Sequence, residues 1–219
     1  MSNKYIFMHL ITALLSMTAV HSQPFIKEIR QFRHLDSLQS PPSKPILFIG
    51  SSSFTNWKDI ASFFPGHVVL NRAFGGSSLP HLIMYAEEVI FKYDPKQIVI
   101  YCGENDLTGG PEITGDSVYQ RFVRLHQLIK RRLPKVPVAY VSMKPSPSRV
   151  KYTVARNEGN RLIEQYMRKT PRTEYIDVTQ KMVASDGRVL PHIFLSDSLH
   201  MNRKGYEIWQ PIIEPYLVK

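Results

Sequence analysis

The chain has 219 residues, with 28 Lys or Arg against 18 Asp or Glu and a formal net charge of +10. A domain of this size removes roughly 70% of its unfolded-chain surface from water, so it needs no disulfide or metal to fold. Cys102 is the single cysteine and cannot form an intramolecular disulfide. The basic residues are scattered apart from Lys130-Arg131-Arg132, so the charge does not indicate a nucleic-acid-binding protein. It indicates a solvated basic surface, with an anionic substrate or matrix as the alternative.

Residues 1–22 have the pattern of a signal peptide. Lys4 gives a positive start, residues 6–20 are mostly apolar, and Val20-His21-Ser22 offers fairly small residues for cleavage. The apolar stretch is shorter than the roughly 20 residues that a membrane-spanning helix needs. We therefore predict a secreted or periplasmic protein with no membrane span after the segment is removed. The alternative is an uncleaved N-terminal anchor.

Residues 23–45 follow as a predicted helix and linker, with Ser40-Pro41-Pro42-Ser43 near their end, and residues 46–219 form one predicted domain. In this domain, apolar β-branched runs alternate with helical patterns. The predicted strands are Ile46–Gly50, His67–Asn71, Gln97–Cys102, Pro137–Met143 and Thr173–Val178. The predicted helices are Asn56–Phe64, Pro80–Tyr93, Asp116–Leu133, Thr153–Lys169 and Asn202–Tyr216.

This order of elements predicts an α/β protein. Strands that are apolar throughout, each followed by a helix, imply a parallel sheet covered on both faces. The expected fold is a three-layer α/β/α sandwich around a five-stranded parallel sheet, with right-handed crossovers. Cys102, at the end of an apolar run, is expected to be a small core residue. Ligands of such sheets bind beyond the carboxyl ends of the strands.

Polar segments stand at several of these positions. Gly50-Ser51-Ser52-Ser53 follows the first strand, residues 71–77 the second, and Gly103-Glu104-Asn105-Asp106 the third, while Asp197-Ser198-Leu199-His200 precedes the last helix. Taken alone, each could be a helix cap or a tight turn. Together they supply a hydroxyl, a base, a carboxylate to orient the base, and donors for an oxyanion. The set therefore predicts ester hydrolysis by a serine nucleophile.

The same segments resemble the sequence blocks of the SGNH, or GDSL-like, hydrolases. Gly50-Ser51-Ser52 corresponds to the usual Gly-Asp-Ser, with Ser51 in the aspartate position. Asn71 and Gly76 match the second block, and Gly103-Glu104-Asn105-Asp106 is the third block unaltered. The last block is Asp197-Ser198-Leu199-His200, and its continuation through Gly205-Tyr206 is also similar. The resemblance covers nearly all of residues 46–216 and implies a flavodoxin-like sheet.

The resemblance also implies roles for individual residues. Ser52 is the expected nucleophile, His200 its base and Asp197 the partner of the base. The expected oxyanion hole consists of the Ser52 N–H, the Gly76 N–H and the Asn105 side chain.

Two further residues are candidates for substrate binding. One is Asn71, in the second block. The other is Pro145, within Lys144-Pro145-Ser146-Pro147-Ser148-Arg149, which follows the fourth strand and either shapes the substrate pocket or forms a rigid surface turn.

The expected substrate is a small ester or an acetylated saccharide. A short acyl group, acetyl above all, is favoured because the chain has no long apolar insertion that could form a lid or an acyl tunnel. No cofactor or metal is expected, since His67 and His81 lack partners at zinc-like spacing. The alternatives are a lysophospholipase or lipase-type acylhydrolase, an O-acyltransferase with the same triad, and a non-catalytic carbohydrate-binding module.

Overall fold

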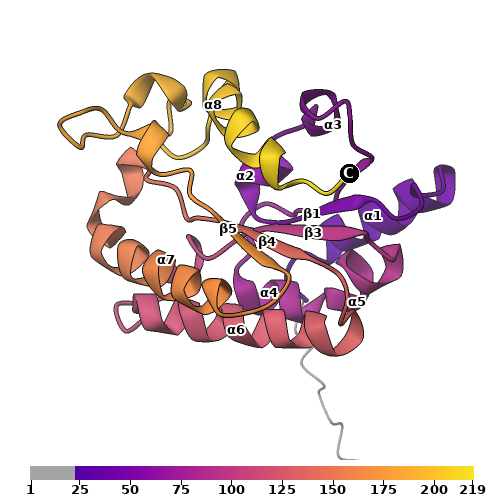
Figure 1. Ribbon diagram of the computed structural model, residues 1–219. Helices are drawn as coiled ribbons and strands as arrows, with labels where there is room; N and C mark the ends of the chain where they lie inside the picture. Colours follow the sequence, from indigo (N-terminus) through magenta and orange to yellow (C-terminus); the bar gives the residue numbers. More distant parts are fainter. Residues whose placement is uncertain (1–22) are drawn as a thin grey trace, which may run out of the picture.

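The computed structural model describes residues 23–219, and the predicted signal peptide lies outside the described residues. Five parallel strands form one sheet in the order β2-β1-β3-β4-β5 (Figure 1). The strands are β1 (Ile46–Gly50), β2 (Val69–Asn71), β3 (Gln97–Tyr101), β4 (Val138–Val141) and β5 (Thr173–Ile176). The predicted five-stranded parallel sheet is confirmed, and the strand order is that of flavodoxin-like folds.

Helices cover both faces of the sheet, which gives the predicted three layers (Figure 1). One face carries α4 (Leu79–Met84), α5 (Ala86–Val89), α6 (Gly115–Arg132) and α7 (Thr153–Arg168), and the other carries α2 (Ser52–Thr55), α3 (Ile60–Phe63) and α8 (Arg203–Ile213). Short 3₁₀ turns complete the set: η1 (Phe91–Tyr93), η2 (Asp106–Thr108), η3 (Pro147–Tyr152), η4 (Gln180–Met182), η5 (Pro191–Ile193) and η6 (Glu214–Tyr216).

The strands are apolar on both sides because successive side chains enter different layers. In β1, Leu47 and Ile49 belong to the core beneath α4–α7, whereas Ile46 and Phe48 belong to the core beneath α2, α3 and α8. All five residues of β1 are fully buried, as are those of β3. This arrangement explains why these strands read as continuous apolar runs and not as alternating ones. Cys102 is buried in the core beneath α4–α7, as predicted.

The longest helix, α6, has stabilising residues at both of its ends. Its N-cap Thr114 accepts a hydrogen bond from the Ser117 N–H at 3.2 Å. The basic cluster Lys130-Arg131-Arg132 forms the last turn, where positive charge interacts favourably with the helix dipole. Two of these residues also contact other parts of the protein: Lys130 donates a hydrogen bond to the Val136 carbonyl, and Arg132 forms an ion pair with Glu87.

Two predicted helices are wrong in their extent. The stretch Asn56–Phe64 contains only the single turn α3, because Trp57 is fully buried and packs on Tyr206 with ring centroids 4.7 Å apart. The stretch Pro80–Tyr93 is divided into α4, α5 and η1. The division falls at Tyr85, whose backbone leaves the helical region while its ring packs against Phe74 and its hydroxyl donates to the Pro24 carbonyl.

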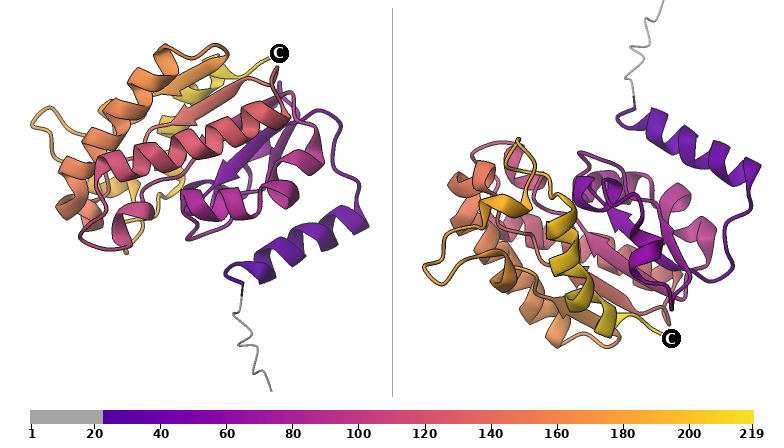
Figure 2. Two further views of the ribbon diagram at one scale, coloured as in Figure 1. Left: turned by 90° about the horizontal axis from the view of Figure 1, so that it is seen from below. Right: turned by 90° about the horizontal axis from the view of Figure 1, so that it is seen from above.

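Residues 23–45 contain α1 (Ile26–Leu38), which lies at the edge of the molecule beside the first strands (Figure 2). Asp36 connects it to the domain: this buried carboxylate accepts hydrogen bonds from Arg72, Lys92 and Tyr93. Burial raises the pKa of Asp36, but these three donors together hold it below its usual value. Across residues 23–219, the structure contains no helix that is both long and apolar enough to cross a membrane.

Candidate active site

The first polar segment begins with a turn that only glycine can make. Gly50 ends β1 with φ +136°, and a Cβ on it would lie 1.8 Å from the Tyr101 carbonyl oxygen of neighbouring β3. The next residue, Ser51, donates its N–H to the same carbonyl at 2.9 Å. The chain therefore leaves the sheet sharply, and Ser52 becomes the first residue of α2.

The three consecutive serines differ in accessibility. Ser51 and Ser53 are buried, with 2% and 1% of their surface exposed. Ser52 between them is partly exposed at the carboxyl edge of the sheet. Of the three hydroxyls, that of Ser52 is therefore the one available to a ligand.

The loop after β2 is fixed to the turn after β1. The Gly50 carbonyl accepts hydrogen bonds from the Phe74 N–H at 2.9 Å and from the Ser77 hydroxyl at 3.0 Å. The loop then passes Ser52 closely, since a Cβ on Gly75 would lie 4.0 Å from the Ser52 Cβ. The backbone of this loop is thus placed beside the accessible hydroxyl.

The block after β3 is joined to the same loop. The Asn105 amide donates to the Ser77 carbonyl at 3.0 Å, which leaves its second amide hydrogen for another acceptor. Gly76 adopts φ +81°, a conformation that favours glycine. In the described part of the chain, neither the Ser52 N–H nor the Gly76 N–H donates a hydrogen bond to a protein group. These three donors are the ones predicted to form the oxyanion hole.

Asp197 and His200 form a hydrogen-bonded pair in a single turn. The Asp197 Oδ2 lies 2.6 Å from the His200 Nδ1, while its Oδ1 accepts the N–H groups of Leu199 and His200, both at 2.9 Å. Ser198 takes the left-handed conformation, with φ +57°, that closes this turn. The His200 N–H, the His200 ring and the Leu199 N–H lower the pKa of Asp197 to about 2. A carboxylate that stays charged and fixed in this way holds the histidine ring in one orientation.

Aromatic packing brings this turn and Ser52 to the same edge. Phe54, two residues after Ser52, meets Trp209 of α8 edge-on with ring centroids 6.2 Å apart. The turn is anchored from its other side by Met201, which pairs with Phe194 and is buried in the same core as Phe54. Within residues 23–219, no hydrogen bond joins the Ser52 hydroxyl to the His200 ring. In enzymes, a contact between a nucleophile and its base is often long in the free protein and shortens when substrate binds.

A buried polar network lies directly behind Asn105. Glu104 accepts hydrogen bonds from the Tyr101 hydroxyl at 2.7 Å, from the Lys144 Nζ at 2.8 Å and from the Ser146 hydroxyl at 2.9 Å. Lys144 is 2% exposed and Glu104 6%. Burial raises the pKa of Glu104, but Lys144 and the two hydroxyl groups hold it below its usual value. The network fixes the residue before Asn105 and joins the ends of β3 and β4.

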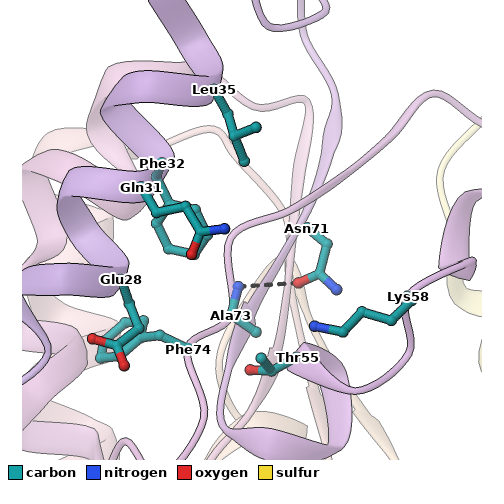
Figure 3. A pocket seen from close by; sticks show the side chains of 9 residues that line it. All are labelled: Glu28, Gln31, Phe32, Leu35, Thr55, Lys58, Asn71, Ala73 and Phe74. Atoms are coloured by element: carbon teal, nitrogen blue, oxygen red, sulfur yellow. Dashed lines mark hydrogen bonds between the residues drawn. The ribbon is translucent and has the colours of Figure 1, made fainter.

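Two cavities are lined by segments that follow strands of the sheet. The first, of about 300 Å³, lies between α1 and the end of β2, and Asn71 and Thr55 are in its wall (Figure 3). Both polar atoms of the Asn71 amide are used inside the protein, because its Nδ2 donates to the Phe54 carbonyl and its Oδ1 accepts the Ala73 N–H. A role for Asn71 in substrate binding stays a prediction.

The second cavity, of about 380 Å³, has Pro145 in its wall. Pro145 is buried, and it follows Lys144 of the buried network directly. The substrate-binding role of Pro145 also stays a prediction.

Sequence reasoning did not identify three features near the site. The Glu104–Lys144 pair was hidden because charged residues are usually exposed. The Ser148 N–H and hydroxyl both donate to the Ser198 carbonyl, which ties the segment after β4 to the 197–200 turn. A small hairpin, closed by pairing of Val183 with Val189, forms part of the second cavity; its Asp-Gly sequence is a hairpin signal that could have revealed it.

His67 and His81 have local structural partners: His67 bonds the Val218 carbonyl and His81 belongs to the cap of α4. Over residues 23–219, the structure groups no three His, Cys, Asp or Glu side chains in a way that could hold a metal ion.

Comparisons with known proteins address the family and the fold. Residues 45–208 match the GDSL-like Lipase/Acylhydrolase family. The fold resembles a Streptococcus pneumoniae protein whose name refers to platelet activating factor, with 19% identity, a TM-score of 0.74, and 88% of this chain and 92% of that chain covered. It also resembles a GDSL-like lipase from Bacteroides thetaiotaomicron, with 20% identity, a TM-score of 0.71 and coverage of 86% and 96%.

A further solved structure is that of a catalytic serine-to-alanine mutant of an acetylxylan esterase from Geobacillus stearothermophilus. It has 14% identity, a TM-score of 0.62, and 78% of this chain and 93% of that chain covered. At these identities the solved structures establish the fold. No curated protein matches the sequence.

The buried network gives a prediction about stability. Lys144→Met should lower the free energy of unfolding by about 3–5 kcal/mol at pH 7, because it leaves the Glu104 carboxylate buried without its countercharge. In the native protein, the lowered pKa of Glu104 contributes stability above its unfolded value of 4.5 that is lost as the pH falls through the folded value. In Lys144→Met the sign reverses: the pKa of Glu104 should lie above 4.5, so acidification from pH 7 to pH 5 should recover part of the loss.

Urea denaturation at the two pH values measures both effects. Lys135→Met, at an exposed position, is the matched control and should change stability little. The double variant Glu104→Gln/Lys144→Met should be more stable at pH 7 than Lys144→Met alone. A loss of stability in Lys144→Met that does not depend on pH would contradict the assigned ion pair.

Proposed function

The chain belongs to the GDSL-like lipase/acylhydrolase family, and we propose that it is an exported serine esterase that removes short acyl groups, chiefly acetyl, from saccharide hydroxyls. Hydrolysis of esters is the activity of this family. The serine mechanism, the residue roles, the acyl length, the saccharide and the export are the proposed parts. Export rests on the signal-like pattern of residues 1–22.

One observation carries the mechanism. An accessible serine at the first residue of α2 stands at the same sheet edge as a histidine whose Nδ1 is 2.6 Å from a carboxylate. This pairing leaves the Nε2 of His200 as the atom that can take a proton from Ser52. The catalytic serine of the acetylxylan esterase, replaced by alanine in its solved mutant, supports the same role for Ser52.

The proposed reaction has two halves. The Ser52 Oγ attacks the ester carbonyl carbon while His200 takes the hydroxyl proton, and His200 then gives that proton to the leaving alcohol oxygen. The acyl group is left on Ser52. Water then attacks the acyl carbon, His200 takes the proton of the water, and Ser52 leaves with that proton as the carboxylic acid is released. Asp197 stays ionised throughout, consistent with its pKa of about 2.

Negative charge develops on the carbonyl oxygen in each half-reaction. The Ser52 and Gly76 N–H groups and the free amide hydrogen of Asn105 are proposed to donate to it. The bond from Asn105 to the Ser77 carbonyl holds the amide in place before substrate arrives. Donors fixed in advance stabilise the transition state without having to reorganise during the reaction.

The short acyl group is supported by the sequence, which has no long apolar insertion that could form a lid or an acyl tunnel. Acetyl is favoured further because one of the similar folds belongs to an acetylxylan esterase.

Covalent labelling tests the nucleophile. A fluorophosphonate probe should add one label to the native protein and none to Ser52→Ala, because Ser52 has the accessible hydroxyl. Ser51→Ala and Ser53→Ala are matched controls at the flanking buried serines and should still be labelled. Intact-protein mass spectrometry measures the label. Labelling that persists in Ser52→Ala and disappears in Ser51→Ala or Ser53→Ala would move the nucleophile.

A series of nitrophenyl esters tests the acyl length. The value of kcat/KM should be higher for acetate and butyrate esters than for laurate and palmitate esters, because the chain has no long apolar insertion that could enclose a long acyl chain. Ser52→Ala provides the blank for spontaneous hydrolysis. Higher kcat/KM on the long esters would favour a lipase or lysophospholipase instead.

Replacement of Asn105 separates the oxyanion hole from the triad. Asn105→Ala should lower kcat on the order of 10²–10³-fold, the typical cost of one oxyanion donor, and change KM little. Asn105→Asp should be at least as damaging, since it places negative charge beside the developing oxyanion. Steady-state kinetics on nitrophenyl acetate measure both parameters. A large rise in KM at unchanged kcat would instead make Asn105 a substrate-positioning residue.

A further inference from the structure

The second cavity has a composition that suits a charged ligand. It lies between the segment after β4, the start of α7 and the 183–189 hairpin, which projects from one end of the molecule (Figure 1). Its volume is about 380 Å³, and its walls include Pro145, Ser146, Val150, Arg156, Arg188 and Val189. None of its lining residues is Asp or Glu, while two of them are arginines. We call this space the Arg156 cavity.

The Arg156 cavity is connected to both parts of the catalytic machinery. Its lining residue Ser146 donates to Glu104, which directly precedes the proposed oxyanion donor Asn105. Ser148, two residues further on, donates its N–H and its hydroxyl to the Ser198 carbonyl at 3.1 and 3.0 Å. Ser198 lies inside the 197–200 turn. The cavity wall that follows β4 is therefore bonded to the residue before Asn105 and, through Ser148, to the 197–200 turn, and it lies at the carboxyl edge of the sheet, as Ser52 does.

Arg156 is held in a way that leaves one edge of its guanidinium free. Its Nε and Nη2 both donate to the Asn157 Oδ1, at 3.3 and 2.9 Å, and Asn157 is on the same helix. Among residues 23–219, the structure gives Arg156 no salt bridge to a carboxylate and its Nη1 no acceptor. The Nη1–Nη2 edge, which can bind two oxygens of one carboxylate side by side, therefore remains available.

The neighbouring charges do not neutralise Arg156. Arg188, the second arginine of the cavity, pairs with Asp186 at 2.7 Å. The buried carboxylate of Glu104 already accepts from Lys144, Tyr101 and Ser146. Arg156 is also partly buried, so its interaction with an anion is screened less by water than that of a surface arginine.

We propose that Arg156 binds a carboxylate on the alcohol part of the substrate, so that the preferred ester is an acetylated acidic saccharide such as a uronate. This inference rests on the proposed esterase function and adds its substrate class. A guanidinium edge matches the planar geometry of a carboxylate, and the valine and proline walls suit the apolar faces of a sugar ring. Binding energy gained at this remote group holds the ester against Ser52 and is expressed in kcat/KM.

Kinetics on matched substrates test the proposal. Acetylated methyl glucuronoside and acetylated methyl glucoside differ only in the carboxylate, and the native protein should prefer the glucuronoside. In Arg156→Gln the ratio of the two kcat/KM values should fall on the order of ten- to hundredfold, the usual loss for one charge-assisted contact. Arg156→Lys should keep part of the preference, since it keeps the charge without the planar edge. Arg161→Gln, on the exposed side of the same helix, is the control and should keep the native ratio.

Several results would overturn the proposal. An equal loss on both substrates in Arg156→Gln would make Arg156 a structural residue. Native protein that hydrolyses nitrophenyl acetate without preferring the glucuronoside would overturn the carboxylate site while leaving the esterase function intact. A greater Arg156-dependent preference for acetylated glycerol phosphate would move the ligand from carboxylate to phosphate. Failure to hydrolyse any ester would overturn the proposed function itself.

Binding can be measured without turnover. In calorimetry, Ser52→Ala should bind methyl glucuronoside more tightly than methyl glucoside, and Ser52→Ala/Arg156→Lys should bind it less tightly than Ser52→Ala does. These two measurements decide the question even if Arg156→Gln does not fold. Equal affinities for the two glycosides in Ser52→Ala would contradict the site.

Discussion

The contact between Gly50 and Tyr101 is the constraint around which the site is built. Two strands approach so closely there that a Cβ at Gly50 would lie 1.8 Å from the Tyr101 carbonyl oxygen. The Gly50 carbonyl in turn accepts both the Phe74 N–H and the Ser77 hydroxyl. The segments that follow β1 and β2 are thereby fixed to each other and to the end of β3, beside Ser52.

Predictions from sequence succeeded where one local property determines the structure. The buried strands were found because a parallel sheet covered on both faces makes β1 and β3 apolar throughout. The helix α6 was found because its apolar residues repeat with a helical period. The Asp197–His200 pair could be anticipated because a three-residue separation fits within one turn.

The failures occur where distant residues determine the structure. Trp57 interrupts a helical pattern because Tyr206, far along the chain, provides its packing partner. Glu104 and Lys144 are 40 residues apart, and no local pattern marks two charged residues for burial together. In the sequence, Arg156 is likewise an ordinary polar residue within a helical pattern. Its place in the wall of the cavity depends on how the 183–189 hairpin and the segment after β4 fold. Pairings of this kind arise from tertiary structure.

The fold and the chemistry of this protein are separable. Solved structures with about 14–20% identity share its sheet and its helical layers, so the architecture depends on pattern more than on particular side chains. The proposed chemistry depends instead on the residues placed around Ser52. The Glu104–Lys144 pair fixes the segment of the proposed oxyanion donor Asn105 from within the protein, and Ser146 joins this pair to the wall of the Arg156 cavity.

The exposure of the triad has a consequence for the fate of an acyl group on Ser52. The Asp197 and His200 side chains keep 47% and 28% of their surface accessible, so the acylated serine would face open solution. In the proposed mechanism, His200 would activate any hydroxyl that reaches it, whether that hydroxyl belongs to water or to a sugar. The partition between the free acid and a new ester would therefore follow the local concentration of acceptor alcohols. In a dilute medium the protein would act as a hydrolase, and within a dense polysaccharide it would also redistribute acyl groups among neighbouring chains.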